Sequence, residues 1–164
     1  MMDAHVLAAK ALDAHALAAR VGQAMFAGDM ASRDTMGMEL VVCEPGRAVL
    51  RMAVRELHLN GHRLCHGGFI FTLADSTFAF ACNSRNRVTV AAGCSIEFLK
   101  PAQLGDLLTC EGQEQTLQGR HGIYDMKVAN QRGDVVAMFR GKSAQIQEMV
   151  VEDTAVGDVR GEGA

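Results

Sequence analysis

The sequence predicts an α+β domain in which a curved antiparallel sheet is wrapped around one long central helix. Residues 67–82 are apolar on every face of a helical wheel, so this helix needs cover on most of its sides. Six other segments show the alternation or the short connections that are typical of antiparallel strands. A single sheet curled around the helix is the simplest arrangement that buries it.

The first part of the chain is expected to form a helix and then a pair of strands. Residues 3–28 are rich in alanine, the best helix former, and their second half is amphipathic. Residues 28–37 are expected to form a loop. Strands are expected in "GMELVVCE" (37–44) and "RAVLRMAVRE" (47–56), which are joined by the turn signal Pro45-Gly46.

Four further strands are expected after the central helix, at 88–100, 106–118, 121–131 and 134–147. Their short links suit antiparallel neighbours. The domain is therefore placed at 33–147. A helical segment at 1–32 precedes it, and an acidic, glycine-containing tail at 148–164 is expected to be disordered.

Composition excludes several classes of function. A net charge of −3 and a pI of about 6.0 argue against a nucleic-acid partner. The five cysteines are odd in number and form no C-x-x-C pair, which indicates a reducing cytoplasm rather than disulfides or a zinc knuckle. The first residues lack the basic region of a signal peptide, and no apolar run approaches the roughly 20 residues of a membrane span. A cytoplasmic protein without a membrane partner is expected.

One carboxylate stands inside the apolar helix. The stretch "NGHRLCHGGFIFTLADSTFAFACN" (60–83) contains Asp75 as its single acid. A buried carboxylate costs free energy unless it is paired or used, and no Lys or Arg lies three or four residues away. Asp75 is therefore a candidate for chemistry, with a capping or ion-pairing role as the alternative.

The helix begins at two glycines, Gly67 and Gly68. The first amides of a helix have no partner within the helix, and the helix dipole attracts negative charge to that end. Glycine lets a ligand approach the backbone closely. An oxyanion formed from a carbonyl group would be stabilised there. The alternative is that the glycines only form the turn into the helix.

Together these features resemble the hotdog-fold acyl-CoA thioesterases of the phenylacetate-degradation (PaaI) type, over roughly residues 33–147. The residues that carry the resemblance are Asn60, His66-Gly67-Gly68, Asp75 and the later "FLKPAQLGD". It implies that the Gly67 N–H binds the oxyanion and that Asp75 acts as nucleophile or general base. It also implies that Asn60 places water or substrate; a turn before Gly61 is the alternative role. His66 is included as a catalytic candidate.

The resemblance implies a substrate such as phenylacetyl-CoA or its ring-hydroxylated forms, with a long-chain or generalist substrate as the alternative, and no cofactor. Some family members carry a serine hydroxyl on the strand after the helix, where this chain reads Val90-Ala91-Ala92-Gly93. Ser76 or Thr89 could substitute for it. Cations are expected at the CoA phosphates. The substrate-binding candidates are Gly68, Phe69, Ser76, Arg85 and Lys100.

Helix geometry indicates that the site is shared. Gly67 and Asp75 lie eight residues apart, or about 12 Å along the helix axis. One carbonyl cannot touch both in the same chain. A two-fold dimer with antiparallel central helices would bring Asp75 of one chain to Gly67 of the other, as the resemblance also implies. A homodimer with shared sites is expected, pairing further into a homotetramer.

Metal and thiol chemistry are not expected. His58, His62 and His66 recur every four residues, but Asn60-Gly61 breaks any helix that would align them as ligands. Cys65 precedes His66, and adjacent side chains seldom point at each other.

Two other functions remain open: a hotdog acyl-thioester dehydratase or hydratase, and a non-catalytic acyl-CoA-binding protein.

Overall fold

The computed structural model describes residues 4–146 and 148–152. In chain order the elements are α1 (Ala4–Gly28), the π-helical turn η1 (Ala31–Thr35), β1 (Met38–Glu44), β2 (Arg47–Ala53), the 3-10 turn η2 (Glu56–His58), α2 (Gly67–Asn83), β3 (Thr89–Phe98), β4 (Leu107–Gln118), β5 (His121–Ala129) and β6 (Val135–Gln145). Both predicted helices and all six predicted strands are confirmed. The prediction of a plain loop at 28–37 was wrong, because η1 forms there.

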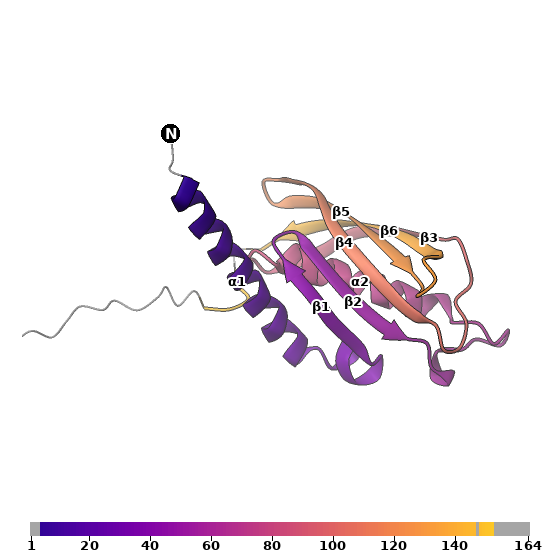
Figure 1. Ribbon diagram of the computed structural model, residues 1–164. Coiled ribbons are helices and arrows are strands. Elements are labelled where there is room, and N and C mark those ends of the chain that lie inside the picture. Colours follow the sequence, from indigo (N-terminus) through magenta and orange to yellow (C-terminus); the bar gives the residue numbers. More distant parts are fainter. Residues whose placement is uncertain (1–3, 147, 153–164) are drawn as a thin grey trace, which may run out of the picture.

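The six strands form one sheet in the order β1-β2-β4-β5-β6-β3, and every neighbouring pair is antiparallel. In Figure 1 the sheet curves over α2, and α1 lies beside β1. The predicted architecture, a curved antiparallel sheet around a central helix, is confirmed. None of the described helices is long and apolar enough to cross a membrane.

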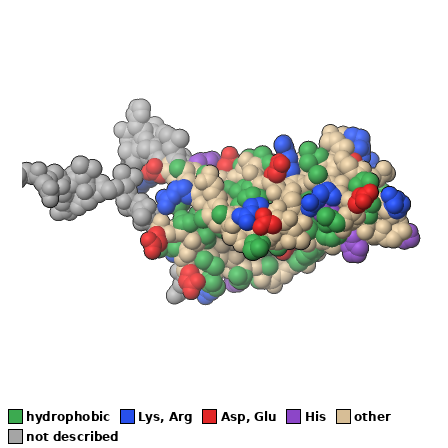
Figure 2. Space-filling model, turned by 90° about the horizontal axis from the view of Figure 1, so that it is seen from below, with side chains coloured by type: hydrophobic (Ala, Val, Ile, Leu, Met, Phe, Trp, Pro, Cys, Tyr) green, Lys and Arg blue, Asp and Glu red, His purple; other side chains and the backbone are tan. Residues whose placement is uncertain are grey.

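The core lies between α2 and the concave side of the sheet. Leu73, Phe78 and Phe80 of α2 are buried, and the Phe78 ring centroid lies 5.5 Å from Tyr124 and 6.0 Å from Phe139. A Cβ at Gly141 would lie 2.8 Å from the Phe78 ring, so this strand position needs a glycine. On the face in Figure 2, acidic and basic side chains are interspersed with hydrophobic ones. Exposed ion pairs contribute at most about 1 kcal/mol each, so the core stabilises the fold.

The edge strand β3 is exposed along most of its length. Among the described strands it pairs only with β6, and Val90 and Phe98 are 50% and 53% exposed. The sheet also leaves one face of α2 uncovered, where Gly68, Thr72 and Asp75 are not buried. The sequence predicted cover on most sides of this helix, and the described part of the chain does not provide it on this face. A long exposed edge strand is a template for pairing with a second chain.

The segment after β6 is bonded to the turn that follows α2. Asn86 accepts hydrogen bonds from the N–H groups of Val150 (3.1 Å) and Val151 (2.9 Å), and its side-chain amide donates to the Val151 carbonyl at 3.0 Å. The tail that was expected to be disordered from Glu148 therefore begins with residues attached to the domain. Its remainder, 153–164, lies outside the described residues.

Candidate active site

The first turn of α2 has one bonded and one unbonded glycine amide. His66 is the N-cap residue, and its Nδ1 accepts the Gly68 N–H at 2.9 Å. Among the described residues no acceptor meets the Gly67 N–H. Because Nδ1 is an acceptor, a neutral His66 carries its proton on Nε2. The structure therefore favours Gly67 over Gly68 as a donor to a ligand.

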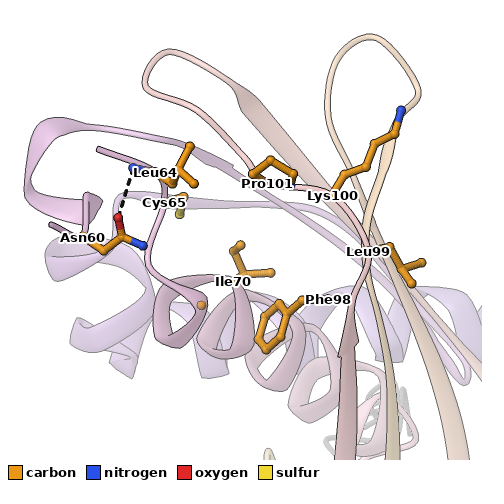
Figure 3. A pocket seen from close by; sticks show the side chains of 9 residues that line it. Asn60, Leu64, Cys65, Ile70, Phe98, Leu99, Lys100 and Pro101 are labelled. Atoms are coloured by element: carbon orange, nitrogen blue, oxygen red, sulfur yellow. Dashed lines mark hydrogen bonds between the residues drawn. The ribbon is translucent and has the colours of Figure 1, made fainter. Parts of the chain in front are cut away.

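A pocket of about 270 Å³ opens beside this amide. We call it the Gly67 pocket; it is lined by Asn60, Leu64, Cys65, Gly67, Ile70, Phe98, Leu99, Lys100 and Pro101 (Figure 3). Three predicted site residues, Asn60, Gly67 and Lys100, are brought together here from separate parts of the chain. The apolar members were not predicted as lining residues, although "FLKP" in the sequence contains three of them together with Lys100.

Asn60 forms the turn that was considered as its alternative role, and its side chain also reaches the Gly67 pocket. Its Oδ1 accepts the N–H groups of His62 (2.9 Å) and Leu64 (3.2 Å), which forms the turn. Its amide nitrogen is directed into the Gly67 pocket (Figure 3). The turn thus holds a second N–H donor on the same pocket as the Gly67 amide.

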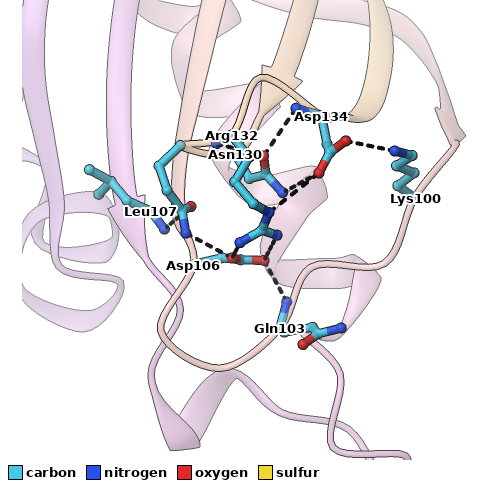
Figure 4. A network of polar contacts seen from close by, with 8 residues as sticks. Lys100, Gln103, Asp106, Leu107, Asn130, Arg132 and Asp134 are labelled. Atoms are coloured by element: carbon cyan, nitrogen blue, oxygen red, sulfur yellow. Dashed lines mark hydrogen bonds and ion pairs between the residues drawn. The ribbon is translucent and has the colours of Figure 1, made fainter.

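A polar network holds the wall of the pocket that contains Lys100 (Figure 4). The Lys100 ammonium lies 2.6 Å from Asp134, and Arg132 contacts both Asp134 and the buried Asp106. Asp106 also accepts the Gln103 N–H at 2.9 Å. Burial alone would raise the pKa of Asp106, but the bonds from Gln103 and Arg132 outweigh it and hold this pKa below its ordinary value.

Replacing Asp106 by alanine should lower the free energy of unfolding by about 2–3 kcal/mol, because its charge-assisted hydrogen bonds are lost. Because the pKa of Asp106 is lower in the folded state, its ionised carboxylate stabilises the fold at pH values above the unfolded pKa. This stabilisation is lost as the pH falls through the folded pKa. The free energy of unfolding of wild type should therefore fall below pH ~4. In Asp106→Ala it should fall less, because there is no carboxylate at this position to protonate. Urea unfolding at several pH values measures both. Asp125→Ala, which removes an exposed pair with Arg140, is the control and should cost at most about 1 kcal/mol.

Asp75 lies half-buried on the uncovered face of α2. No hydrogen bond or ion pair reaches its carboxylate from the described residues, so the capping and ion-pairing alternatives are not seen within the chain. Burial raises the pKa of Asp75 above its ordinary value. A half-desolvated, unpaired carboxylate is a stronger base than a solvated one and remains available for chemistry.

Comparisons with known proteins identify the family of this chain. The family model of the Thioesterase superfamily matches residues 62–137. The chain is 42% identical to the acyl-coenzyme A thioesterase PaaI of Escherichia coli over 75% of its own length and 87% of that protein. This chain belongs to the thioesterase superfamily.

Solved structures of relatives show the same fold. The structure of the E. coli PaaI protein, from the phenylacetic acid degradation operon, matches with a TM-score of 0.80 at 40% identity, over 82% of this chain and 97% of that one. A Streptococcus mutans protein bound to acetyl CoA matches with a TM-score of 0.66 at 28% identity, over 68% and 90% of the two chains. The predicted hotdog fold and the PaaI-type thioesterase family are confirmed, and the protein is an enzyme.

Other predicted residues of this thioesterase lie away from the Gly67 pocket. The Ser76 hydroxyl is 2.9 Å from that of Ser32, in η1, and Ser32 donates to Asp29 at 2.7 Å. The Thr89 hydroxyl donates to the Arg87 carbonyl at 2.7 Å. Both hydroxyls that could replace the family serine therefore have partners inside the chain.

The two predicted cations have different positions. Lys100 lines the Gly67 pocket, whereas Arg85 follows the C-terminal end of α2 and pairs with Glu114. Glu114 also accepts the Tyr124 hydroxyl at 2.8 Å. The structure therefore does not bring Arg85 to the Gly67 pocket of its own chain.

The histidines and Cys65 show no metal or nucleophile geometry. Within residues 4–146 and 148–152, no three His, Cys, Asp or Glu side chains are grouped to hold a metal ion. His58 is buried and its Nδ1 accepts the Arg55 N–H at 3.1 Å, whereas His62 is exposed. Burial raises the pKa of the Cys65 thiol to about 11, so this thiol is protonated at neutral pH.

Proposed function

We propose that this protein hydrolyses acyl-CoA thioesters at two equivalent sites, each formed by Gly67 and Asn60 of one subunit and Asp75 of the other. The observation that carries the proposal is the unbonded Gly67 N–H in a pocket with Asn60, combined with an unpaired Asp75 on the open face of the same helix. The acyl-CoA substrate class is supported by PaaI of E. coli and by the relative bound to acetyl CoA.

The dimer is supported by the exposed edge of the sheet. Antiparallel pairing of two β3 strands would continue the sheet across both chains and would cover the exposed Val90 and Phe98. The same two-fold axis would place the α2 helices antiparallel, with their open faces together. Asp75 of each chain would then lie near Gly67 of the other. Pairing of two such dimers into a homotetramer is part of the proposal.

Gly67, Asn60 and Asp75 each have a separate role in the proposed reaction. The Gly67 N–H donates to the carbonyl oxygen as it gains negative charge, and the Asn60 amide orients water or the carbonyl. Asp75 takes the proton from a water that attacks the carbonyl carbon. The C–S bond then breaks, and the proton passes to the leaving thiolate. In the other route, Asp75 itself attacks and water opens the mixed anhydride.

For the acyl group we propose phenylacetyl or ring-hydroxylated phenylacetyl, in a cytoplasmic enzyme. The support is the similarity to the PaaI protein of a phenylacetic acid degradation operon. A panel of acetyl-, hexanoyl-, decanoyl-, phenylacetyl- and hydroxyphenylacetyl-CoA, followed by thiol release, tests this. The arylacetyl esters should have the highest kcat/KM. A higher kcat/KM for decanoyl-CoA would contradict the aryl preference, and a change in enoyl absorbance without thiol release would indicate a hydratase.

A further inference from the structure

The exposed His66 ring offers one unused hydrogen-bond donor on the side of α2 that faces η1. Its Nδ1 accepts the Gly68 N–H at 2.9 Å, so the neutral ring carries its proton on Nε2. Among residues 4–146 and 148–152 no acceptor meets this proton. The ring lines a pocket of about 330 Å³ together with Met36, which directly follows η1. This donor therefore points away from the Gly67 pocket.

The Ser76 hydroxyl offers an unused acceptor on the same side of α2. Its oxygen lies 2.9 Å from that of Ser32 in η1, which is 1% exposed and donates its own proton to Asp29 at 2.7 Å. A hydroxyl has one proton and an ionised carboxylate only accepts, so Ser76 must be the donor to Ser32. Lone pairs of the Ser76 oxygen remain free, and no donor in the described part of the chain reaches them.

The free donor and the free acceptor can meet only between two chains. His66 and Ser76 are ten positions apart, which is about 15 Å along α2. In two antiparallel helices related by a two-fold axis, one step forward along one helix matches one step back along the other. If Gly67 of one chain faces Asp75 of the other, as in the proposed dimer, then His66 of the first chain faces Ser76 of the second.

The two-fold axis also brings matching sides of the helices together. Gly67 lies on the β3 side of α2, since a Cβ there would be 3.1 Å from Phe98. His66 and Ser76 lie on the η1 side. An axis at right angles to both helices and to the line that joins them keeps the two β3 sides together and the two η1 sides together. The donor of one chain and the acceptor of the other thus lie on the same side of the dimer.

We propose that His66 of each subunit donates its Nε2–H to the Ser76 oxygen of the partner subunit. This inference rests on the proposed dimer and adds a positioning pair to each of its sites. The bond fixes the ring that caps the Gly68 N–H, and so keeps the Gly67 N–H free for the carbonyl oxygen. It also holds the first turn of α2 in register with the partner's Asp75.

Nitrogen-15 NMR of the histidine rings tests the bond. The His66 Nε2–H should exchange slowly with water in the dimer and give a resolved signal, which is identified by its absence in His66→Asn. Ser76→Ala should abolish this signal, and Ser76→Thr, the matched control that keeps a hydroxyl, should retain it. His58 is fully buried and its Nδ1 accepts the Arg55 N–H, so its Nε2–H signal is an internal standard for every variant. A His66 signal that persists in Ser76→Ala overturns the pair.

A mixed dimer shows whether the bond crosses the interface. A labelled Ser76→Ala chain paired with an unlabelled His66→Asn chain places the labelled His66 ring opposite an intact Ser76. The His66 signal that is lost in the Ser76→Ala homodimer should return in this mixed dimer. Its continued absence, with the mixed dimer confirmed by mass spectrometry, would show that the bond does not join two subunits.

Thiol release tests whether the pair positions the site. Ser76→Ala should lower kcat by about 10-fold and change KM by less than about 2-fold, whereas Ser76→Thr should stay within about 2-fold of wild type in both. His66→Asn keeps an N-cap acceptor. The double variant should be no slower than His66→Asn alone, because both changes remove the same bond; a loss equal to the product of the two single losses contradicts the pair.

The outcome for wild type separates this inference from the proposed function. A wild-type dimer that hydrolyses thioesters but lacks the slowly exchanging His66 signal overturns only the positioning pair. A wild type that releases no thiol from any acyl-CoA overturns the proposed function itself.

Discussion

The Asp75→Asn variant is expected to fold and dimerise normally and to lose at least ~10²-fold in kcat. The amide keeps the shape of the side chain but can neither accept a proton from water nor attack the carbonyl. Steady-state thiol release, combined with size-exclusion chromatography, measures this. A kcat near that of wild type would remove Asp75 from the reaction.

Unfolding experiments on the same variant test the environment of the carboxylate. A raised folded-state pKa means that the ionised Asp75 destabilises the fold, so its contribution to stability falls as the pH rises through the folded pKa. Asp75→Asn should therefore be at least as stable as wild type at pH 7. This advantage should disappear below the ordinary pKa of aspartate, near pH ~4.

Isotope labelling distinguishes the two routes open to Asp75. After a single turnover in heavy-oxygen water, direct attack by water places the label only in the released acid. Attack by Asp75 followed by hydrolysis of the anhydride places it in the Asp75 carboxylate. We expect the first result, because an aspartate side chain is short and a water can bridge its distance to the carbonyl. Label in Asp75 would show that Asp75 itself attacks the carbonyl and that water then opens the anhydride. The thioesterase assignment would remain intact.

The Gly67→Pro variant is expected to lose about 10²–10³-fold in kcat, with a smaller change in KM, because proline lacks the N–H that stabilises the transition state. Proline is tolerated at the first position of a helix. Gly67→Ala is the matched control, since its Cβ meets Phe98 at 3.1 Å as any side chain here would, yet it keeps the N–H. Comparable losses in both variants would attribute the effect to crowding by Phe98.

Mixing Gly67→Pro subunits with Asp75→Asn subunits tests the shared site. If each site takes one residue from each chain, a mixed dimer has one site with both defects and one intact site. It should recover about half of the wild-type activity per dimer. With subunit exchange confirmed by mass spectrometry, mixed dimers as inactive as both parents would place Gly67 and Asp75 in the same chain's site.

Local patterns were sufficient to predict most of the fold. The positions of α2 and of the six strands, though not every boundary, follow from periodicity and turn residues, which act over a few positions and need no knowledge of distant contacts. Asp75 was recognisable for the same reason, because a single acid in an apolar helix is visible without a structure. The helical turn η1 was missed, since its polar sequence "ASRDT" has no apolar period and the local hydrogen bond from the Ser32 N–H to Asp29 was not anticipated.

The sequence by itself determined the family, the central helix and the residue types at its start. The tertiary structure decided which of them are available: the His66 ring bonds the Gly68 amide and leaves that of Gly67 free. It also decided that Lys100 is held by Asp134, and that Met36 reaches the far side of the first turn of α2. The physical reason is that the Lys100–Asp134 pair and the pockets join groups that are distant in the chain, and that even the local His66 bond depends on a side-chain rotamer set by packing.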